Sequence, residues 1–166
     1  LARQTNSYGN FEHIVSNTGE IYTDGSGGRK GVPPHHRQVG FGAVAFTFES
    51  NDSAIRAREL AALWGGVPGA QTVPRAETWA VVQSLWRGHE HPCHVHSDAQ
   101  YVVGGVSAKL EERCANTHGG MWCGLREEIA TRPSRFKVVV SNVKGHADAQ
   151  LLRQGNISVV EMLGNG

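Results

Sequence analysis

The sequence has few cysteines and no long apolar run. Its three cysteines, Cys93, Cys114 and Cys123, are an odd number and lack the regular spacing of a disulfide framework. A reduced, intracellular chain is the simplest interpretation, with cytoplasm and nucleus not distinguished. No apolar run approaches the length of about 20 residues that a membrane-spanning helix needs, and the N-terminus lacks a signal-peptide pattern. We therefore expect no membrane partner.

The sequence also lacks an excess of charge of either sign. Its 16 Lys and Arg nearly balance 15 Asp and Glu, which gives a net charge of +1. This balance argues against a uniformly basic nucleic-acid-binding surface, although a nearly neutral net charge is compatible with a local basic face. With 166 residues, 39% of them hydrophobic, the chain is long enough for one domain with a core and too short for two. Because it begins at Leu1 and ends abruptly at Gly164-Asn165-Gly166, we expect either a monomer or one domain of a larger polyprotein.

The order of strand-like and helix-like segments predicts an α/β (α+β) fold with a mixed sheet flanked by helices. Residues 1–17 are polar and weakly patterned, and we expect them to form a poorly ordered lead-in to a domain at 18–166. Five strands and three helices are expected, with strands at 21–23, 40–48, 60–67, 93–97 and 136–143, and helices at 74–88, after Asp98, and at 121–130.

Two apolar patterns predict burial. Trp79 and Trp86 recur at helical spacing on one face, which indicates core residues rather than base-stacking ones. The unbroken run Val138-Val139-Val140 suits a strand that is covered on both faces.

Three isolated acids fall at the ends of these elements. Asp24 ends the first strand, Glu77 lies in the first turn of a helix, and Asp98 stands at a strand-to-helix junction. Strand ends and helix starts are places where side chains from distant segments can converge. Converged carboxylates repel one another unless cations neutralise them, and oxygen ligands favour Mg²⁺ or Mn²⁺ over Zn²⁺. Such a site can hold two ions, one activating a water and the other stabilising the leaving oxygen in phosphodiester hydrolysis.

Any single acid among the 15 is usually a solvated surface group, so the motifs around the three acids decide their interpretation. In chain order these motifs are Tyr22-Thr23-Asp24-Gly25-Ser26-Gly27, Arg75-Ala76-Glu77, Ser97-Asp98-Ala99-Gln100-Tyr101-Val102 and Lys144-Gly145-His146-Ala147. Together they resemble the successive motifs of the type 1 ribonuclease H family, which includes cellular enzymes and the nuclease domains of retroelement and retroviral reverse transcriptases. The resemblance implies a ribonuclease H-like fold with a five-stranded sheet. It also implies endonucleolytic hydrolysis of the RNA strand of RNA/DNA hybrids.

The resemblance implies a role for each matching residue. Asp24, Glu77 and Asp98 would hold two Mg²⁺ or Mn²⁺ ions, with Asp24 shared by both, and His146 would assist proton transfer or product release. Contacts with the hybrid would rely on groove shape and 2′-hydroxyls rather than on base sequence. Four further positions would make these contacts: Gly25, Ser26, Arg75 and Gln100.

One departure from the family pattern concerns a catalytic position. The family usually carries a fourth acid in a Gly-Asn-x-x-(small)-Asp motif beyond the histidine. Here Gly155-Asn156 is followed by Val160 at the position of the acid, and Glu161 is a weak substitute. We favour an alignment in which an insertion follows His146 and the motif begins at Gly164-Asn165. The position of the acid then lies just past Gly166, so we expect the domain to be truncated at its C-terminus.

The missing acid defines an alternative function, a catalytically weak or silent domain that binds hybrids. A DNA-acting nuclease of the integrase or transposase type fits less well. The Lys-Gly-His-Ala motif and the glycine-rich turn after Asp24 are both typical of ribonuclease H.

A histidine-rich segment precedes the third acid. His94 and His96 would share a face of the strand at 93–97, with His96 just below Asp98. No cysteine is spaced to complete a zinc site there. We therefore predict no dedicated metal centre at these histidines.

Overall fold

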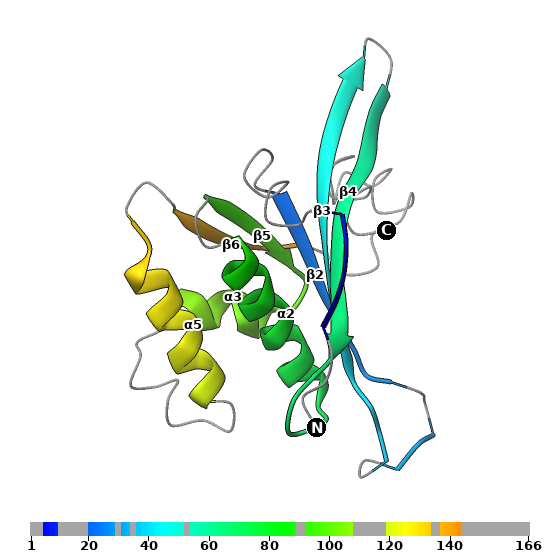
Figure 1. Ribbon diagram of the computed structural model, residues 1–166, viewed down its shortest axis with the longest axis vertical. Helices are drawn as coiled ribbons and strands as arrows, with labels where there is room; N and C mark the ends of the chain where they lie inside the picture. The colour runs from blue at the N-terminus through cyan, green and yellow to red at the C-terminus, as the bar shows by residue number, and fades with distance from the viewer. Residues whose placement is uncertain are drawn as a thin grey trace.

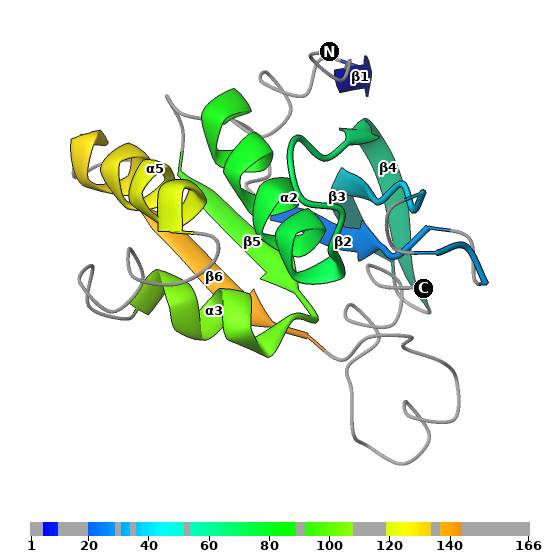
Figure 2. The same cartoon turned by 90° about the horizontal axis from the view of Figure 1, so that it is seen from below.

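The computed structural model describes residues 5–9, 20–28, 31–33, 36–51, 54–88, 92–107, 119–133 and 137–143. In this part of the chain, six strands form one sheet in the order β1-β4-β3-β2-β5-β6, and the helices lie on one side of it (Figures 1 and 2). The strands are β1 (Thr5–Tyr8), β2 (Glu20–Ser26), β3 (Gly40–Asn51), β4 (Ala54–Gly66), β5 (Cys93–Ser97) and β6 (Val138–Asn142). The helices are α2 (Val73–Arg87), α3 (Gln100–Ser107) and α5 (Gly119–Thr131).

The sheet is mixed, as the sequence predicts. The pairs β1–β4, β4–β3 and β3–β2 are antiparallel, whereas β2–β5 and β5–β6 are parallel. The prediction of five strands is wrong by one, because β1 adds to the outer edge of β4 with Thr5 opposite Gly65 and Tyr8 opposite Ala62. This strand lies within the polar stretch 1–17, and it pairs through backbone hydrogen bonds, which need no apolar pattern.

Helix α2 begins and ends where its sequence signals predict. The Thr72 side chain accepts a hydrogen bond from the backbone N–H of Arg75 at 3.4 Å, Pro74 lies in the first turn, and Gly88 caps the C-terminus. Ala76 and Ala80 are fully buried, and such short side chains let the helix lie close to the sheet. This close approach brings the start of α2 to the end of β2.

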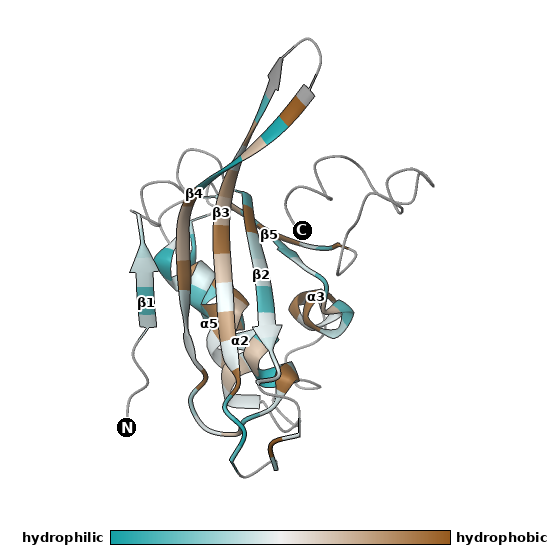
Figure 3. Cartoon of the chain, turned by 90° about the vertical axis from the view of Figure 1, so that its right-hand side faces the viewer, coloured by the Kyte–Doolittle hydropathy of each residue, from teal (hydrophilic) through white to brown (hydrophobic). Residues whose placement is uncertain are grey.

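The core lies between the helices and one face of the sheet. The strand residues Ile21, Ala43 and Val95 are fully buried there, and the middle of β3 is largely apolar (Figure 3). The hairpin of β3 and β4 extends well beyond the other strands (Figure 1), and β4 begins at Ala54 rather than near residue 60. The start of β4 was missed because its polar residues pair with β3 without being buried in the core.

The structure corrects one predicted burial pattern and half of another. Strand β6 is an edge strand, and Val139 is 51% exposed, so among the described residues its apolar run is not covered on both faces. Trp86 is 47% exposed and contacts Trp79 edge-to-face, with ring centroids 5.5 Å apart. Trp79 is half-buried and packs against the core, so the prediction holds for Trp79 and is wrong for Trp86, because helical spacing fixes a shared face but not how far that face is covered.

The state of the cysteines also differs from the expectation of a reduced chain. Cys123 is disulfide-bonded, whereas Cys93 is buried and free. Disulfide formation depends on spatial proximity, which sequence spacing alone does not reveal. Among the described residues, no helix is both long and apolar enough to cross a membrane.

We expect Gly105→Ala to destabilise the protein. A Cβ atom at Gly105 would lie 2.1 Å from the ring of Trp122, which is itself buried, so α3 and α5 would have to separate. Overpacking of this kind costs about 1–3 kcal/mol. The matched control is Gly104→Ala in the same helix, where nothing lies within 4 Å of the new atom, and helix propensity predicts a gain of about 0.5–1 kcal/mol. Urea unfolding of both variants measures this, and equal changes would contradict the packing.

Candidate metal centre

Three carboxylates from separate elements converge at one end of the sheet. Asp24 comes from β2, Glu77 from α2, and Asp98 from the residue after β5. Each offers an oxygen, and these oxygens all lie within 4.8 Å of one another. The predicted convergence is confirmed, and the role of the three residues as metal ligands stays a prediction.

The parallel pairing of β2 and β5 brings two of the acids together. Thr23 lies beside Ser97 in the register of the two strands, so the following residues, Asp24 and Asp98, emerge side by side. The Thr23 hydroxyl also donates a hydrogen bond to the His96 carbonyl at 3.1 Å, which fastens the two strands just before the acids.

The turn that carries Asp98 is held by hydrogen bonds from both sides. The Ser97 hydroxyl oxygen accepts a hydrogen bond from the backbone N–H of Ala99 at 3.2 Å. The Asn142 side chain donates to the carbonyls of Ser97 and Asp98, both at 3.2 Å. Asn142 is the last residue of β6. The sequence does not predict its role, because a polar residue at a strand end gives no sign of what it will contact.

Gly25 allows β2 to approach α2. A Cβ atom at Gly25 would lie 2.7 Å from the backbone nitrogen of Glu77 and 2.8 Å from its carboxyl carbon. The backbone N–H of Gly25 donates a hydrogen bond to the Glu77 carboxylate. The structure therefore gives Gly25 a part in placing Glu77, and its approach to RNA stays a prediction.

We expect Gly25→Ala to displace Glu77 and to destabilise the fold by about 1–3 kcal/mol, because neither the backbone of α2 nor the buried carboxylate can yield freely. Gly42→Ala is the matched control, since Gly42 is paired with Asp24 and has open space around the new atom. Thermal unfolding with and without Mg²⁺ measures both effects. A Gly25→Ala variant with wild-type stability and wild-type response to Mg²⁺ would contradict this packing.

The environment of Glu77 disfavours its charged form. The residue is only 6% exposed. Burial, and then the neighbouring carboxylates of Asp24 and Asp98, raise its pKa from 4.5 to about 7, against the opposing effect of the Gly25 hydrogen bond. Among the described residues, none donates a hydrogen bond to its buried Oε2 atom. A divalent cation would satisfy this oxygen and neutralise the cluster, so the three residues fit an Mg²⁺ or Mn²⁺ site.

Tyr101 is a further neighbour of the acids. Its hydroxyl donates a hydrogen bond to the Pro74 carbonyl at 3.0 Å, which joins the first turn of α3 to that of α2. Burial, and then the carboxylates of Glu77 and Asp98, raise the pKa of Tyr101, so its hydroxyl stays protonated as a donor. The residue stands one turn after Asp98, and this spacing is the signal that could have marked it as a site residue.

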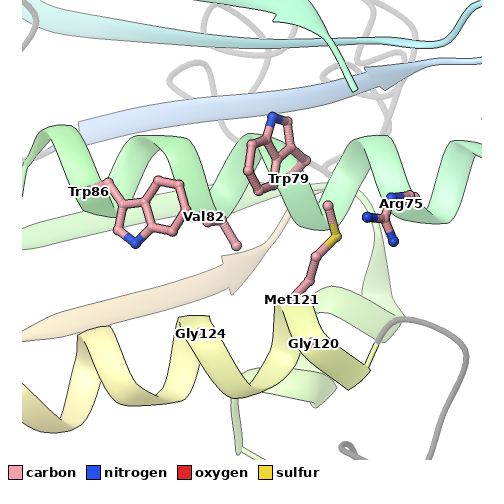
Figure 4. Close-up of a pocket in the computed structure, with 7 residues that line it drawn as sticks. All are labelled: Arg75, Trp79, Val82, Trp86, Gly120, Met121 and Gly124. Carbon is pink, nitrogen blue, oxygen red and sulfur yellow. The ribbon is translucent and has the colours of Figure 1, made fainter. Parts of the chain in front are cut away.

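The residues expected to contact a hybrid lie in different settings. Ser26 and Gln100 are exposed, and each follows an acid by two positions. The Arg75 Nε atom donates a hydrogen bond to the Pro68 carbonyl at 2.6 Å. Arg75 also lines one end of a groove between α2 and α5, whose other lining residues are Trp79, Val82, Trp86, Gly120, Met121 and Gly124 (Figure 4).

The predicted His146 lies outside the described residues. The same holds for the positions considered for a fourth acid, from Gly155-Asn156 to Gly166. The structure therefore describes three of the four predicted catalytic residues.

Comparisons with known proteins agree with this fold. The family model for RNase H matches residues 16–161. No curated protein matches the sequence. A solution structure of the prototype foamy virus RNase H domain is 23% identical, with a TM-score of 0.62 over 89% of this chain and 87% of that one.

Two larger structures are also similar in fold. The prototype foamy virus protease-reverse transcriptase is 21% identical, with a TM-score of 0.58 over 90% of this chain. A foamy viral protease-reverse transcriptase in complex with an RNA/DNA hybrid is 19% identical, with a TM-score of 0.55 over 86% of this chain. The chain spans 20% and 19% of the lengths of these two proteins.

Proposed function

The chain belongs to the RNase H family, and from this membership we propose that it hydrolyses the RNA strand of RNA/DNA hybrids at the Asp24–Glu77–Asp98 centre. The observation that carries the proposal is the convergence of these three carboxylates within 4.8 Å. A group of like charges is costly without a cation, and it stands where α2 and two strand ends meet. The convergence of these acids and the oxygen donors that they offer support the proposal.

Asp24, Glu77 and Asp98 would hold Mg²⁺ or Mn²⁺. Two such ions, when bound, supply an activated water and stabilise the leaving oxygen. The Gly25 N–H orients the Glu77 carboxylate toward the other two acids. Asn142 holds the backbone at Asp98, so the carboxylate is placed before substrate arrives.

The exposed residues around the acids suit recognition of a hybrid. Ser26 and Gln100 flank the centre on two different elements and offer hydrogen-bonding groups to solvent. Such groups can contact sugar hydroxyls and phosphates in the minor groove without reading base sequence. In this proposal Arg75, two positions before Glu77, supplies positive charge near the nucleic-acid backbone. His146 would move a proton or assist product release, as the family motif implies.

The foamy viral relative bound to an RNA/DNA hybrid supports this class of ligand. The same relative is a protease-reverse transcriptase, so we propose that this chain acts as one domain of a larger polyprotein of the reverse-transcriptase kind.

A catalytically weak domain that binds hybrids is the second candidate. The residues that match the family model include Gly155-Asn156 and end at Glu161, and Val160 stands where the motif would carry its acid. With one anionic ligand fewer, the ions would bind less tightly, and cleavage would be slow.

Cleavage of a hybrid labelled on either strand tests the proposal. We expect the RNA strand alone to be cut, only when a divalent ion is present, and faster with Mn²⁺, which tolerates imperfect ligation better than Mg²⁺. Salt-dependent binding with no cleavage in either ion would support the second candidate instead. Cleavage of the DNA strand or of duplex DNA would contradict both candidates.

A further inference from the structure

A second group of side chains that can bind a metal lies on the face of the sheet opposite the described helices. Along β5, Cys93, Val95 and Ser97 are buried on the helix side, so His94 and His96 point to the other face. Glu20 of β2 lies beside His94 in the parallel register and therefore shares that face.

The three side chains are in direct contact. The His96 Nε2 atom lies 2.5 Å from Glu20 Oε2, and the His94 Nδ1 atom lies 3.4 Å from Glu20 Oε1. One ligand atom from each residue can be chosen so that all three lie within 4.8 Å of one another. One carboxylate thus lies against two imidazoles.

Neighbouring residues fix the orientation of both imidazoles. The Tyr22 ring stacks on His96, with centroids 4.4 Å apart and planes 14° from parallel, and Phe46 packs edge-to-face on Tyr22. The Nε2 atom of His94 forms a 2.7 Å hydrogen bond with the Ser141 hydroxyl, which leaves Nδ1 directed at Glu20. His94 is held as metal-binding histidines commonly are, with one ring nitrogen bonded to the protein and the other facing the ion.

We propose that Glu20, His94 and His96 form a binding site for Zn²⁺ or a divalent transition ion of similar chemistry. Two imidazoles and a carboxylate are a common ligand set for zinc, and imidazole ligands disfavour Mg²⁺. Bonds of about 2.0–2.2 Å at the tetrahedral angle separate ligand atoms by about 3.4 Å, which is the distance between His94 Nδ1 and Glu20 Oε1. An ion would replace the hydrogen bond between His96 and Glu20.

The site is reachable from solvent and separate from the acidic centre. The side chains of Glu20 and His94 are 35% exposed, and that of His96 is 11% exposed, so a fourth ligand position can face outward. The sequence predicts no metal centre at these histidines, because no cysteine is spaced to complete the set. The completing ligand is Glu20, which is distant in sequence and adjacent only through the pairing of β2 with β5.

An ion at this site would tie together the two strands that carry Asp24 and Asp98. Glu20 lies on β2 before Asp24, and His96 lies on β5 before Asp98. Because the ion binds the paired strands and not the unfolded chain, it should stabilise the fold by mass action.

The test uses metal-free protein titrated with Zn²⁺, and with Co²⁺ as a spectroscopic probe. We expect one Zn²⁺ per chain at the site, a higher midpoint of thermal unfolding, and visible Co²⁺ absorption of a four- or five-coordinate ion with imidazole ligands. Glu20→Gln and His94→Gln should each weaken Zn²⁺ binding by about tenfold or more, since even the loss of a residue that only supports a ligand costs 10–100-fold. Glu20→Gln retains the shape and hydrogen-bonding capacity of the side chain, so the variant should fold like the wild type.

Two controls separate this site from others. Asp24→Asn should leave the Zn²⁺ response intact, because the acidic centre is a different site. His36→Gln should also leave it intact, because it removes an exposed histidine elsewhere. Equal Zn²⁺ affinity in the wild type and in both Glu20→Gln and His94→Gln would overturn the proposal. So would loss of binding in Asp24→Asn, or absence of binding at micromolar Zn²⁺.

Discussion

Asp98→Asn should slow cleavage of the RNA strand by about 100-fold or more while leaving the fold intact. The substitution removes one of three anionic ligands and keeps nearly the same side-chain shape. Mutational losses of this order follow removal of a single group that stabilises charge in the transition state. The turn itself is held through backbone atoms by Ser97 and Asn142, which the substitution leaves in place.

Single-turnover cleavage of a labelled hybrid gives the rate, and filter binding gives the affinity for the same substrate. Glu49→Gln is the matched control, because it also removes one negative charge but lies on the exposed part of the β3–β4 hairpin beside Arg58. We expect wild-type cleavage from this control. Asp98→Asn with wild-type cleavage would remove Asp98 from the proposed centre.

Glu77→Gln should make the metal-free protein more stable at pH 8 than the wild type. The pKa of Glu77 is raised from 4.5 in the unfolded chain to about 7 in the fold, so the folded state disfavours the carboxylate. Below pH 4.5 the residue is protonated in both states, and its ionisation does not lower the free energy of unfolding. The wild type loses stability as the pH rises from 4.5 to 7. Above pH 7 the total loss is about 3 kcal/mol, because each unit of difference in pKa corresponds to 1.36 kcal/mol.

Added Mg²⁺ should reverse this order of stability, so that the wild type becomes more stable than Glu77→Gln. The wild type regains stability when the ion neutralises the cluster, whereas the neutral amide of the variant holds the ion poorly. The measurement is urea unfolding at pH 4.5 and at pH 8, each in EDTA and in Mg²⁺. A constant difference between the two proteins under all four conditions would show that Glu77 does not titrate in the range given and does not bind the ion.

The strand ends and helix starts that position the acids are readable from the sequence. Strand β5 has the predicted bounds, and α2 lies within one residue of the helix predicted at 74–88, with Pro74 in its first turn and Gly88 as its C-cap. These signals are local, so no knowledge of the fold is needed to recognise them. The convergence of the acids then follows from the general rule that such positions meet at one edge of a sheet.

Other features depend on contacts that local patterns do not encode. Strand β1 is polar and is defined only by the edge of β4 that it pairs with. The supporting roles of Tyr101 and Asn142 depend on which backbone carbonyls happen to lie within reach. Glu20 joins His94 and His96 only because β2 pairs with β5. In each case the partner comes from a segment that is distant along the chain.

The most direct test of the proposed metal centre follows Mn²⁺ binding and RNA cleavage together. Mn²⁺ is titrated into protein with hybrid present, free ion is measured by its electron paramagnetic resonance signal, and the cleavage rate is measured in the same samples. We expect the rate to rise with occupancy of the Asp24–Glu77–Asp98 centre, and Asp24→Asn to lose this binding and the cleavage together. An Asp24→Asn variant that binds Mn²⁺ like the wild type, or that cleaves the RNA strand at the wild-type rate, would contradict the proposed centre.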